Sequence, residues 1–270
     1  MSAPAMYDVM GPRAERRVRR FTATGAVIAA GLASLALWQL GSNGLLRWEV
    51  WSILGNRDFA RLMFDGAWAT LQVALIAIVL SFAGGLGLAL CALSESKTLY
   101  YATKVWIEIF RGIPLLVLVF FHYLGLPAIG IVLNPFWSLI LAIALYNSAV
   151  MCEILRSGVN ALPRGQSEAA YALGFRKYQV LAKVVLPQAI KIMLPALVSQ
   201  MVIVLKESSL GFVIGYGELL RNGRITVDYS GTIHAIPVYI TIALLYLSIN
   251  ILLSKIAREI QRRNSREAIA

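Results

Sequence analysis

Long apolar runs without a charged residue recur along the chain. They cover residues 21–46, 66–94, 112–152 and 229–254, and a fifth apolar run, 184–205, is interrupted only by Lys191. A helix that crosses a bilayer needs about 20 mostly apolar residues. Each of these runs is therefore long enough to cross a membrane.

The run 112–152 contains two turn signals, Gly125-Leu126-Pro127 and Asn134-Pro135, and is read as two spans joined by a tight turn. The runs lack the strict alternation of a transmembrane barrel strand. The chain is thus predicted to be an all-α polytopic membrane protein with six transmembrane helices. The predicted spans are 21–41, 67–93, 104–124, 135–152, 184–205 and one that ends near residue 256.

Composition supports a membrane protein and disfavours a fold with an aqueous surface. Hydrophobic residues make up 59% of the 270 residues, charged residues only 14%, and the mean hydropathy is +0.70, whereas a soluble domain carries about 25% charged residues. The net charge of +11 does not indicate nucleic-acid binding, because Lys and Arg cluster beside the apolar runs. Positive charge marks the cytoplasmic side, so both termini are predicted to be cytoplasmic, with loops 47–65 and 206–228 outside.

The spans suggest how the chain is divided. We expect a basic, mobile cytoplasmic tail over 1–20, an additional N-terminal span over 21–41 and a second basic tail over 258–270. The start imitates a signal peptide, but its apolar run is too long and lacks an A-x-A-like site, which favours an uncleaved anchor. Cys91 and Cys152 are expected to be free structural thiols, and no metal site is expected.

The longest polar stretch between spans is the predicted cytoplasmic loop 153–187. Pro163 favours the start of a helix and Gly174 its end in a left-handed cap. Between them, Ala169 and Ala170 leave a slim helix face that suits insertion into a groove on another protein. Composition alone favours an ordinary connecting loop over a docking helix.

The order of the residues in this loop resolves that choice. Glu168-Ala169-Ala170, then Gly174, then Val184-x-Leu186-Pro187 resembles the EAA loop of ABC-importer permeases, with Val in place of Ile. Four further segments resemble the polar amino-acid permeases of that family: 111–116 (R-G-I-P-L-L), 146–156, 165–168 (G-Q-S-E) and 206–210 (K-E-S-S-L). The likeness covers residues 65–257, which we interpret as the permease core.

The resemblance implies a type I importer permease in a bacterial cytoplasmic membrane. Its expected partners are ATPase subunits, a second permease subunit (the same or a homologous chain), an extracytoplasmic substrate-binding protein and membrane lipid, with no nucleic acid. The chain lacks a G-x-x-x-x-G-K-[ST] motif, so it is predicted to be no enzyme and to bind no cofactor, with ATP and Mg on the partner ATPase subunits. The residues expected to dock the ATPase are Glu168, Ala169, Ala170, Tyr171, Leu173 and Gly174.

Polar residues at membrane depth indicate the substrate site, since they usually face an interior or a cavity. Arg111 is proposed to take the carboxylate of an amino acid in a fork, and Glu207 its ammonium. Further predicted contacts are Pro114, Gln200, which shares a helix face with Glu207, and Ser208. The alternatives are an internal ion pair of Arg111 with Glu108, three residues earlier, and interhelical hydrogen bonding for Gln200.

The charges of Arg111 and Lys206 favour glutamate over glutamine or aspartate as the substrate, although the sequence does not fix it. One alternative function is an ion channel, because 213–217 (V-I-G-Y-G) resembles a potassium-channel filter. Its position after the K-E-S-S-L segment, in a six-span chain, argues against that role. His122 is expected to be a packed or interfacial residue. A membrane-embedded enzyme is disfavoured because neither G-x-S-x-G nor H-E-x-x-H occurs.

Overall fold

The computed structural model describes residues 11–266, and every regular element among them is a helix. The chain divides into two compact units, one up to Ile53 and one from Leu54 onward. The elements in chain order are α1 Pro12–Ser42, α2 Trp48–Trp51, η1 Ser52–Gly55, α3 Arg57–Ala92, α4 Lys97–Gly112, α5 Leu115–Phe120, η2 Phe121–Gly125, η3 Leu126–Ile129, α6 Pro135–Asn160, α7 Arg164–Ala172, α8 Lys177–Val180, η4 Leu181–Val185, α9 Leu186–Glu207, η5 Ser208–Ile214, α10 Leu219–Ser230, η6 Thr232–His234 and α11 Ala235–Arg266.

The first unit consists mainly of the long helix α1. Pro12 occupies its first turn, where a missing backbone N–H costs nothing. The basic residues that follow Pro12 are therefore helical, so the helix of the predicted N-terminal span extends back into the described part of the predicted tail over 1–20. Residues 1–10 lie outside the described part of the chain.

The C-terminal tail is also helical where it is described. Helix α11 continues to Arg266, beyond the predicted boundary at residue 258, and residues 267–270 lie outside the described part. A helix does not need apolar residues to continue past the membrane surface, so both predicted basic tails are helical in their described parts.

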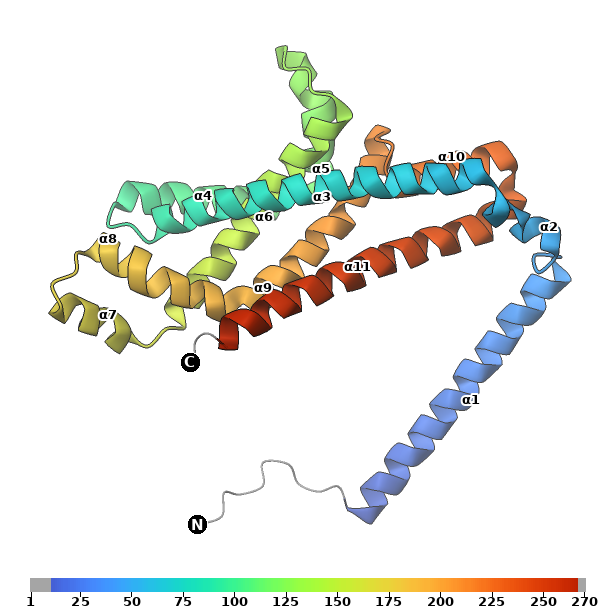
Figure 1. Ribbon diagram of the computed structural model, residues 1–270, viewed down its shortest axis with the longest axis horizontal. Coiled ribbons are helices and arrows are strands. Elements are labelled where there is room, and N and C mark those ends of the chain that lie inside the picture. The colour runs from blue at the N-terminus through green and yellow to red at the C-terminus, as the bar shows by residue number, and fades with distance from the viewer. Residues whose placement is uncertain (1–10, 267–270) are drawn as a thin grey trace. The chain divides into compact units, whose positions relative to one another are not determined.

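Five helical segments are long and apolar enough to cross a membrane, and a bent pair brings the number to six. Figure 1 shows α3, α6, α9 and α11 as long helices of the second unit. The predicted third span, 104–124, is not one helix. It breaks after Gly112, and the segments Lys97–Gly112 and Leu115–Ile129 lie at 96° to each other.

The break has a local cause at Pro114. Ile113 has extended backbone angles (φ −87°, ψ 127°), the conformation that a following proline imposes. Pro114 has no N–H to continue the helix and instead precedes the first turn of α5. A hydropathy pattern carries no information about this bend, because the apolar run continues through it.

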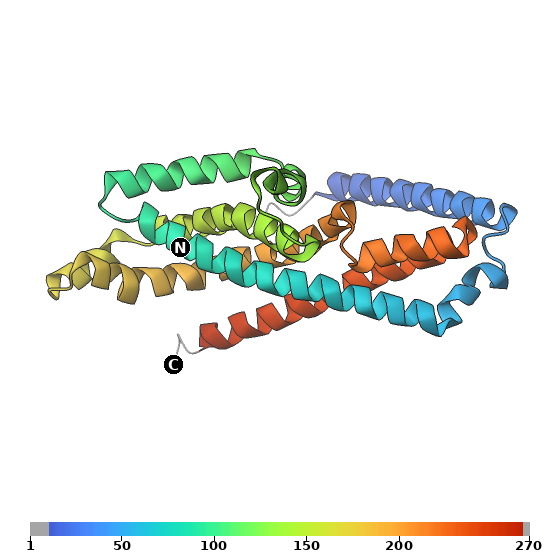
Figure 2. The ribbon, with the colours of Figure 1, turned by 90° about the horizontal axis from the view of Figure 1, so that it is seen from above.

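Helix α6 is the centre of the second unit and contacts both α3 and α9 (Figure 2). Glycines of α3 permit its close approach to α6. A Cβ atom at Gly85 would lie 2.5 Å from the Met151 Cβ, and one at Gly84 would lie 3.0 Å from the Ser148 Cβ. Gly87, in contrast, faces open space.

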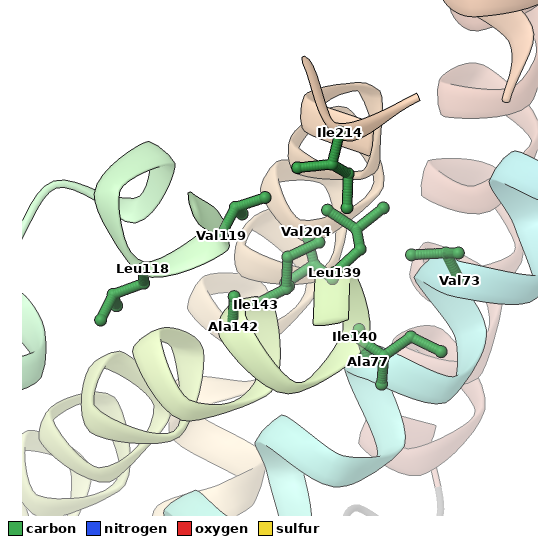
Figure 3. Packing of buried hydrophobic residues seen from close by; sticks show 10 residues of the cluster. All are labelled: Val73, Ala77, Leu118, Val119, Leu139, Ile140, Ala142, Ile143, Val204 and Ile214. Carbon is green, nitrogen blue, oxygen red and sulfur yellow. The ribbon is translucent and has the colours of Figure 1, made fainter. Parts of the chain in front are cut away.

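A cluster of buried aliphatic side chains holds these helices together (Figure 3). Its members come from five segments of the second unit: Val73, Ala77, Leu118, Val119, Leu139, Ile140, Ala142, Ile143, Val204 and Ile214. The predicted turn between the spans of 112–152 is also present. Gly130 adopts φ +83°, and the Asn134 side chain caps α6 by accepting a hydrogen bond from the Trp137 N–H at 2.9 Å.

Candidate functional site

The polar loop after α6 folds into the short helix α7, with the ends that the sequence predicts. Pro163 precedes its first residue, and Gly174 follows its last turn with φ +82°. The Gly174 N–H donates to the Tyr171 carbonyl (2.9 Å) and the Phe175 N–H to the Ala170 carbonyl (3.2 Å). These two hydrogen bonds form a Schellman motif, which needs a left-handed residue at its centre.

One face of α7 rests on a small core of its own. Ala170 is 4% exposed and packs with Val180 and Val185. Ala170 therefore supports the helix from beneath. The sequence placed Ala170 in the docking surface, but its burial removes it from that surface. Val184, the position that departs from the family pattern, packs against the same core.

The other side chains of the α7 segment point outward. Glu168 and Ala169 are exposed, and Leu173 and Tyr171 are 78% and 46% exposed. Figure 1 shows α7 projecting from one end of the second unit. An ion pair between Lys177 Nζ and Glu95 Oε1 (2.9 Å) joins the segment after α7 to the turn between α3 and α4, so this segment is tied to the helical bundle.

Three polar side chains form a network between α6 and α9. Gln200 Nε2 donates to Asn147 Oδ1 at 2.6 Å, and Asn147 Nδ2 donates to Glu207 Oε2 at 2.6 Å. Gln200 and Glu207 lie on one face of α9, as predicted, two turns apart. The sequence analysis missed Asn147, although a lone amide within an apolar run is a signal of interior hydrogen bonding.

Arg111 lies in the last turn of α4. The ion pair with Glu108, which the sequence offered as an alternative, does not form. Arg111 Nη1 lies 3.8 Å from Glu153 Oε2 on α6, while Glu108 pairs with Lys104 on α4 at 3.8 Å. Glu153 also accepts two hydrogen bonds from Arg156, at 2.9 and 3.1 Å. Sequence spacing along one helix therefore gave the wrong partner, because a neighbouring helix supplies a better acceptor.

These charged side chains line a cavity of about 230 Å³, which we call the α4–α6 cavity. Its lining residues are Ala92, Tyr100, Thr103, Lys104, Ile107, Glu108, Arg111, Glu153 and Arg156. Glu153 follows Asn147 by six residues on α6, which places it about 9 Å further along the helix axis. The structure thus divides the predicted substrate residues between two places.

The remaining predicted substrate residues, Ser208 and Pro114, have roles within the fold itself. Ser208 is fully buried, and its hydroxyl donates to the Leu205 carbonyl at 2.6 Å, so it presents no free atom to a ligand. Pro114 stands at the bend between α4 and α5. His122 is 7% exposed, with Nδ1 2.8 Å from the Leu118 carbonyl oxygen, and it is a packed residue as predicted.

The segment that resembles a channel filter is a turn packed against the core. Gly215 takes φ +77° after η5, and the Tyr216 ring lies 5.9 Å from the ring of Phe136. Tyr216 also packs on the buried aliphatic cluster of Figure 3. Its side chain therefore stabilises the fold, and the segment does not have the form of a pore lining.

Glu218, which directly follows that segment, is a buried carboxylate. It is fully buried and caps α10, accepting hydrogen bonds from the N–H groups of Leu220 (2.8 Å) and Arg221 (2.7 Å). The Tyr246 hydroxyl donates to the same carboxylate at 3.0 Å. Burial raises the pKa of Glu218, and these hydrogen bonds partly oppose the rise.

Comparison with known proteins places these features in a family. Residues 83–266 match the family of binding-protein-dependent transport system inner membrane components. The chain is 36% identical over 228 residues to the glutamate transport system permease protein GluD of Corynebacterium glutamicum, covering 83% of each chain. It is 36% identical over 211 residues to a probable glutamine ABC transporter permease protein, GlnP of Bacillus subtilis, covering 78% of this chain and 97% of that one.

A solved structure has a similar fold. The crystal structure of an amino acid ABC transporter with histidines superposes with a TM-score of 0.71 at 34% identity. The match covers 78% of this chain and 98% of that chain.

Proposed function

Because the chain belongs to the binding-protein-dependent transport system inner membrane components and is the permease subunit of an amino-acid ABC importer, we propose that it imports glutamate across a bacterial cytoplasmic membrane. Such permeases are not catalytic and work with separate ATPase subunits, a partner permease and a binding protein. In the proposed complex ATP and Mg stay on the ATPase subunits, the partner permease is a copy or a homologue of this chain, and both termini face the cytoplasm.

The observation that carries the mechanism is the exposed helix α7. Its Schellman motif fixes the helix end, its small core around Ala170 supports it, and Tyr171 and Leu173 remain exposed. An exposed apolar side chain on a rigid short helix suits a groove on a partner. We assign α7, with Glu168, Ala169, Tyr171, Leu173 and Gly174, as the coupling element of an EAA loop that docks on an ATPase subunit.

The network of Asn147, Gln200 and Glu207 supports a substrate site at membrane depth. A carboxylate there is costly unless it meets a cation or hydrogen-bond donors. Glu207 already accepts a hydrogen bond from Asn147, and its second oxygen suits the ammonium of a passing amino acid. Gln200 orients Asn147 through the 2.6 Å hydrogen bond between their amides.

Glutamate is supported by charge and by relatives. Lys206, next to Glu207, is exposed, and a cation beside the site favours a substrate with an additional carboxylate. The likeness to the permease GluD points the same way, while the likeness to GlnP supports glutamine as the competing substrate.

Competition decides between these substrates. In the assembled transporter, uptake of labelled glutamate should be suppressed more strongly by unlabelled glutamate than by an equal concentration of glutamine, aspartate, arginine or histidine. Preferential uptake of arginine or histidine would exclude the proposed specificity, while leaving the amino-acid importer assignment intact.

A further inference from the structure

Helix α4 is amphipathic, and its faces are placed in the reverse of the order found in a water-soluble protein. The face that lines the α4–α6 cavity is polar, whereas the other face is apolar and exposed; the exposed members are Tyr101, Val105, Trp106 and Ile109. In a membrane-spanning chain an exposed apolar face suits lipid, and charged side chains face an interior or a water-filled cavity. The α4–α6 cavity is therefore a water-accessible space, open enough to leave the Lys104, Glu108 and Arg111 side chains 57%, 66% and 49% exposed, that α4 separates from the surrounding lipid.

Among the residues that line this cavity, positive charge exceeds negative charge by one. The cations are Lys104, Arg111 and Arg156, and the anions are Glu108 and Glu153. Glu153 is shared, because it binds Arg156 at 2.9 Å and lies 3.8 Å from Arg111. Each guanidinium carries five N–H donors, so the cavity contains more cationic donors than its two carboxylates accept. An anion with planar oxygen acceptors complements this arrangement.

The volume of the cavity and its position along α6 indicate which anion it binds. A volume of about 230 Å³ equals several water molecules at roughly 30 Å³ each, which suits a small solute. Arg156 lies one turn before the end of α6 at Asn160, and α7 begins at Arg164. The cavity therefore lies toward the α7 side of Asn147 on α6, away from the network that contains Glu207.

We propose that the α4–α6 cavity is a second amino-acid site, which binds the carboxylate of an imported amino acid from the α7 side and slows further import. The inference rests on the proposed function for the cytoplasmic position of α7 and for glutamate. Lys104 belongs to α4 and Arg156 to α6, so a carboxylate bound between them holds the two helices in one arrangement. A ligand that stabilises one arrangement of α4 and α6 slows a transport cycle in which these two helices must change their arrangement.

Product-loaded proteoliposomes test this proposal with the complete transporter. The vesicles contain ATP and a graded concentration of glutamate, at constant ionic strength, and the initial uptake of external labelled glutamate is measured. Each variant is normalised to its own rate with a glutamate-free lumen. The variants are Lys104→Gln, which removes the excess charge, Lys104→Arg, which retains it, and Lys97→Gln. Lys97 is an exposed lysine of the same helix that does not line the cavity.

The wild-type protein should be slowed by luminal glutamate at least twofold. Lys104→Gln should raise the half-inhibiting concentration about fivefold, the effect expected for the loss of one partly exposed ion pair, and the other two variants should match the wild type. The proposal is overturned if luminal glutamate leaves wild-type uptake unchanged, or if Lys104→Gln is inhibited at the wild-type concentration. Failure of glutamate uptake even with a glutamate-free lumen contradicts the proposed substrate instead, and this inference falls with it.

Discussion

At the residue scale, the polar network between α6 and α9 makes Glu207 the most informative side chain. Its carboxylate is held by Asn147 at 2.6 Å. A glutamine at this position keeps an oxygen that accepts the same hydrogen bond but removes the negative charge. The substitution therefore separates the role of the charge from the role of the hydrogen bond.

We expect Glu207→Gln to insert and assemble normally and to lower uptake at low substrate concentration by about 10- to 100-fold, the effect of losing a charged partner worth 1.5–3 kcal/mol. Initial rates in proteoliposomes measure it. Ser209→Ala is the control, because Ser209 lies two residues away and its hydroxyl bonds only the local Lys206 carbonyl among the hydrogen bonds described. Wild-type uptake by Glu207→Gln would remove Glu207 from the substrate site.

Glu218 makes the stability of the fold depend on pH. Burial raises the pKa of its carboxyl in the folded chain, so the folded chain holds the proton at a pH where the unfolded chain has lost it. By linkage, the free energy of unfolding then falls as the pH rises above the ordinary carboxyl value of 4.5, and it levels off above the raised value.

Glu218→Gln should remove this decrease, because an amide does not titrate. Denaturant unfolding in detergent, measured across the acidic range, checks the difference in slope. Asp65→Asn is the matched control, since the Asp65 side chain is 61% exposed and should leave the pH dependence as it is. An identical slope in Glu218→Gln and the wild type would contradict the assignment.

At the scale of elements, α7 is the segment whose geometry connects most directly to transport. Gly174 and Gly130 have nearly the same backbone angle, φ +82° and +83°, and a Cβ at either would meet nothing within 4 Å. A non-glycine residue costs roughly 1–2 kcal/mol in this conformation. The two glycines therefore form a matched pair in which only the location differs.

Gly174→Asp should abolish substrate-stimulated ATP hydrolysis or ATPase association, because it strains the end of α7, the proposed docking helix, and places a charge beside Leu173. Gly130→Asp should retain both, since it lies in the connection before α6. Co-purification and ATPase assays measure the two effects. Normal coupling in Gly174→Asp, or an equal loss in Gly130→Asp, would exclude α7 as the docking element.

The sequence predicted α7 well because its boundaries are set locally by Pro163 and Gly174. It failed at Pro114, where the apolar run continues through a bend of 96°, since hydropathy measures composition and not direction. The alternative of an Arg111–Glu108 ion pair was wrong as well, because the acidic partner of Arg111, Glu153, belongs to another helix. Asn147 was missed for a related reason: its role depends on which helix faces it, and a single sequence contains no such pairing.

At the scale of the whole molecule, orientation in the membrane remains a proposal based on charge. In a background with Cys91 and Cys152 replaced by Ser, a cysteine at position 55 should react with an impermeant thiol reagent in intact spheroplasts, whereas one at position 165 should react only after lysis. Gly55 and Gly165 are both exposed, so access alone does not distinguish them. Labelling of position 165 in intact spheroplasts would reverse the topology.

In the proposed importer, transport and ATP hydrolysis take place on different polypeptides. In the proposed complex this chain supplies the translocation pathway and the docking helix α7, whereas ATP hydrolysis takes place on other subunits. A chain that worked as a channel would instead conduct ions without any partner.

The most direct test compares the purified chain alone with the complex that co-purifies with it, both reconstituted with the substrate-binding protein. We predict ATP-dependent uptake of labelled amino acid, with substrate-stimulated ATP hydrolysis, by the complex only. Potassium flux or ATP-independent amino-acid uptake through the chain alone would contradict the account.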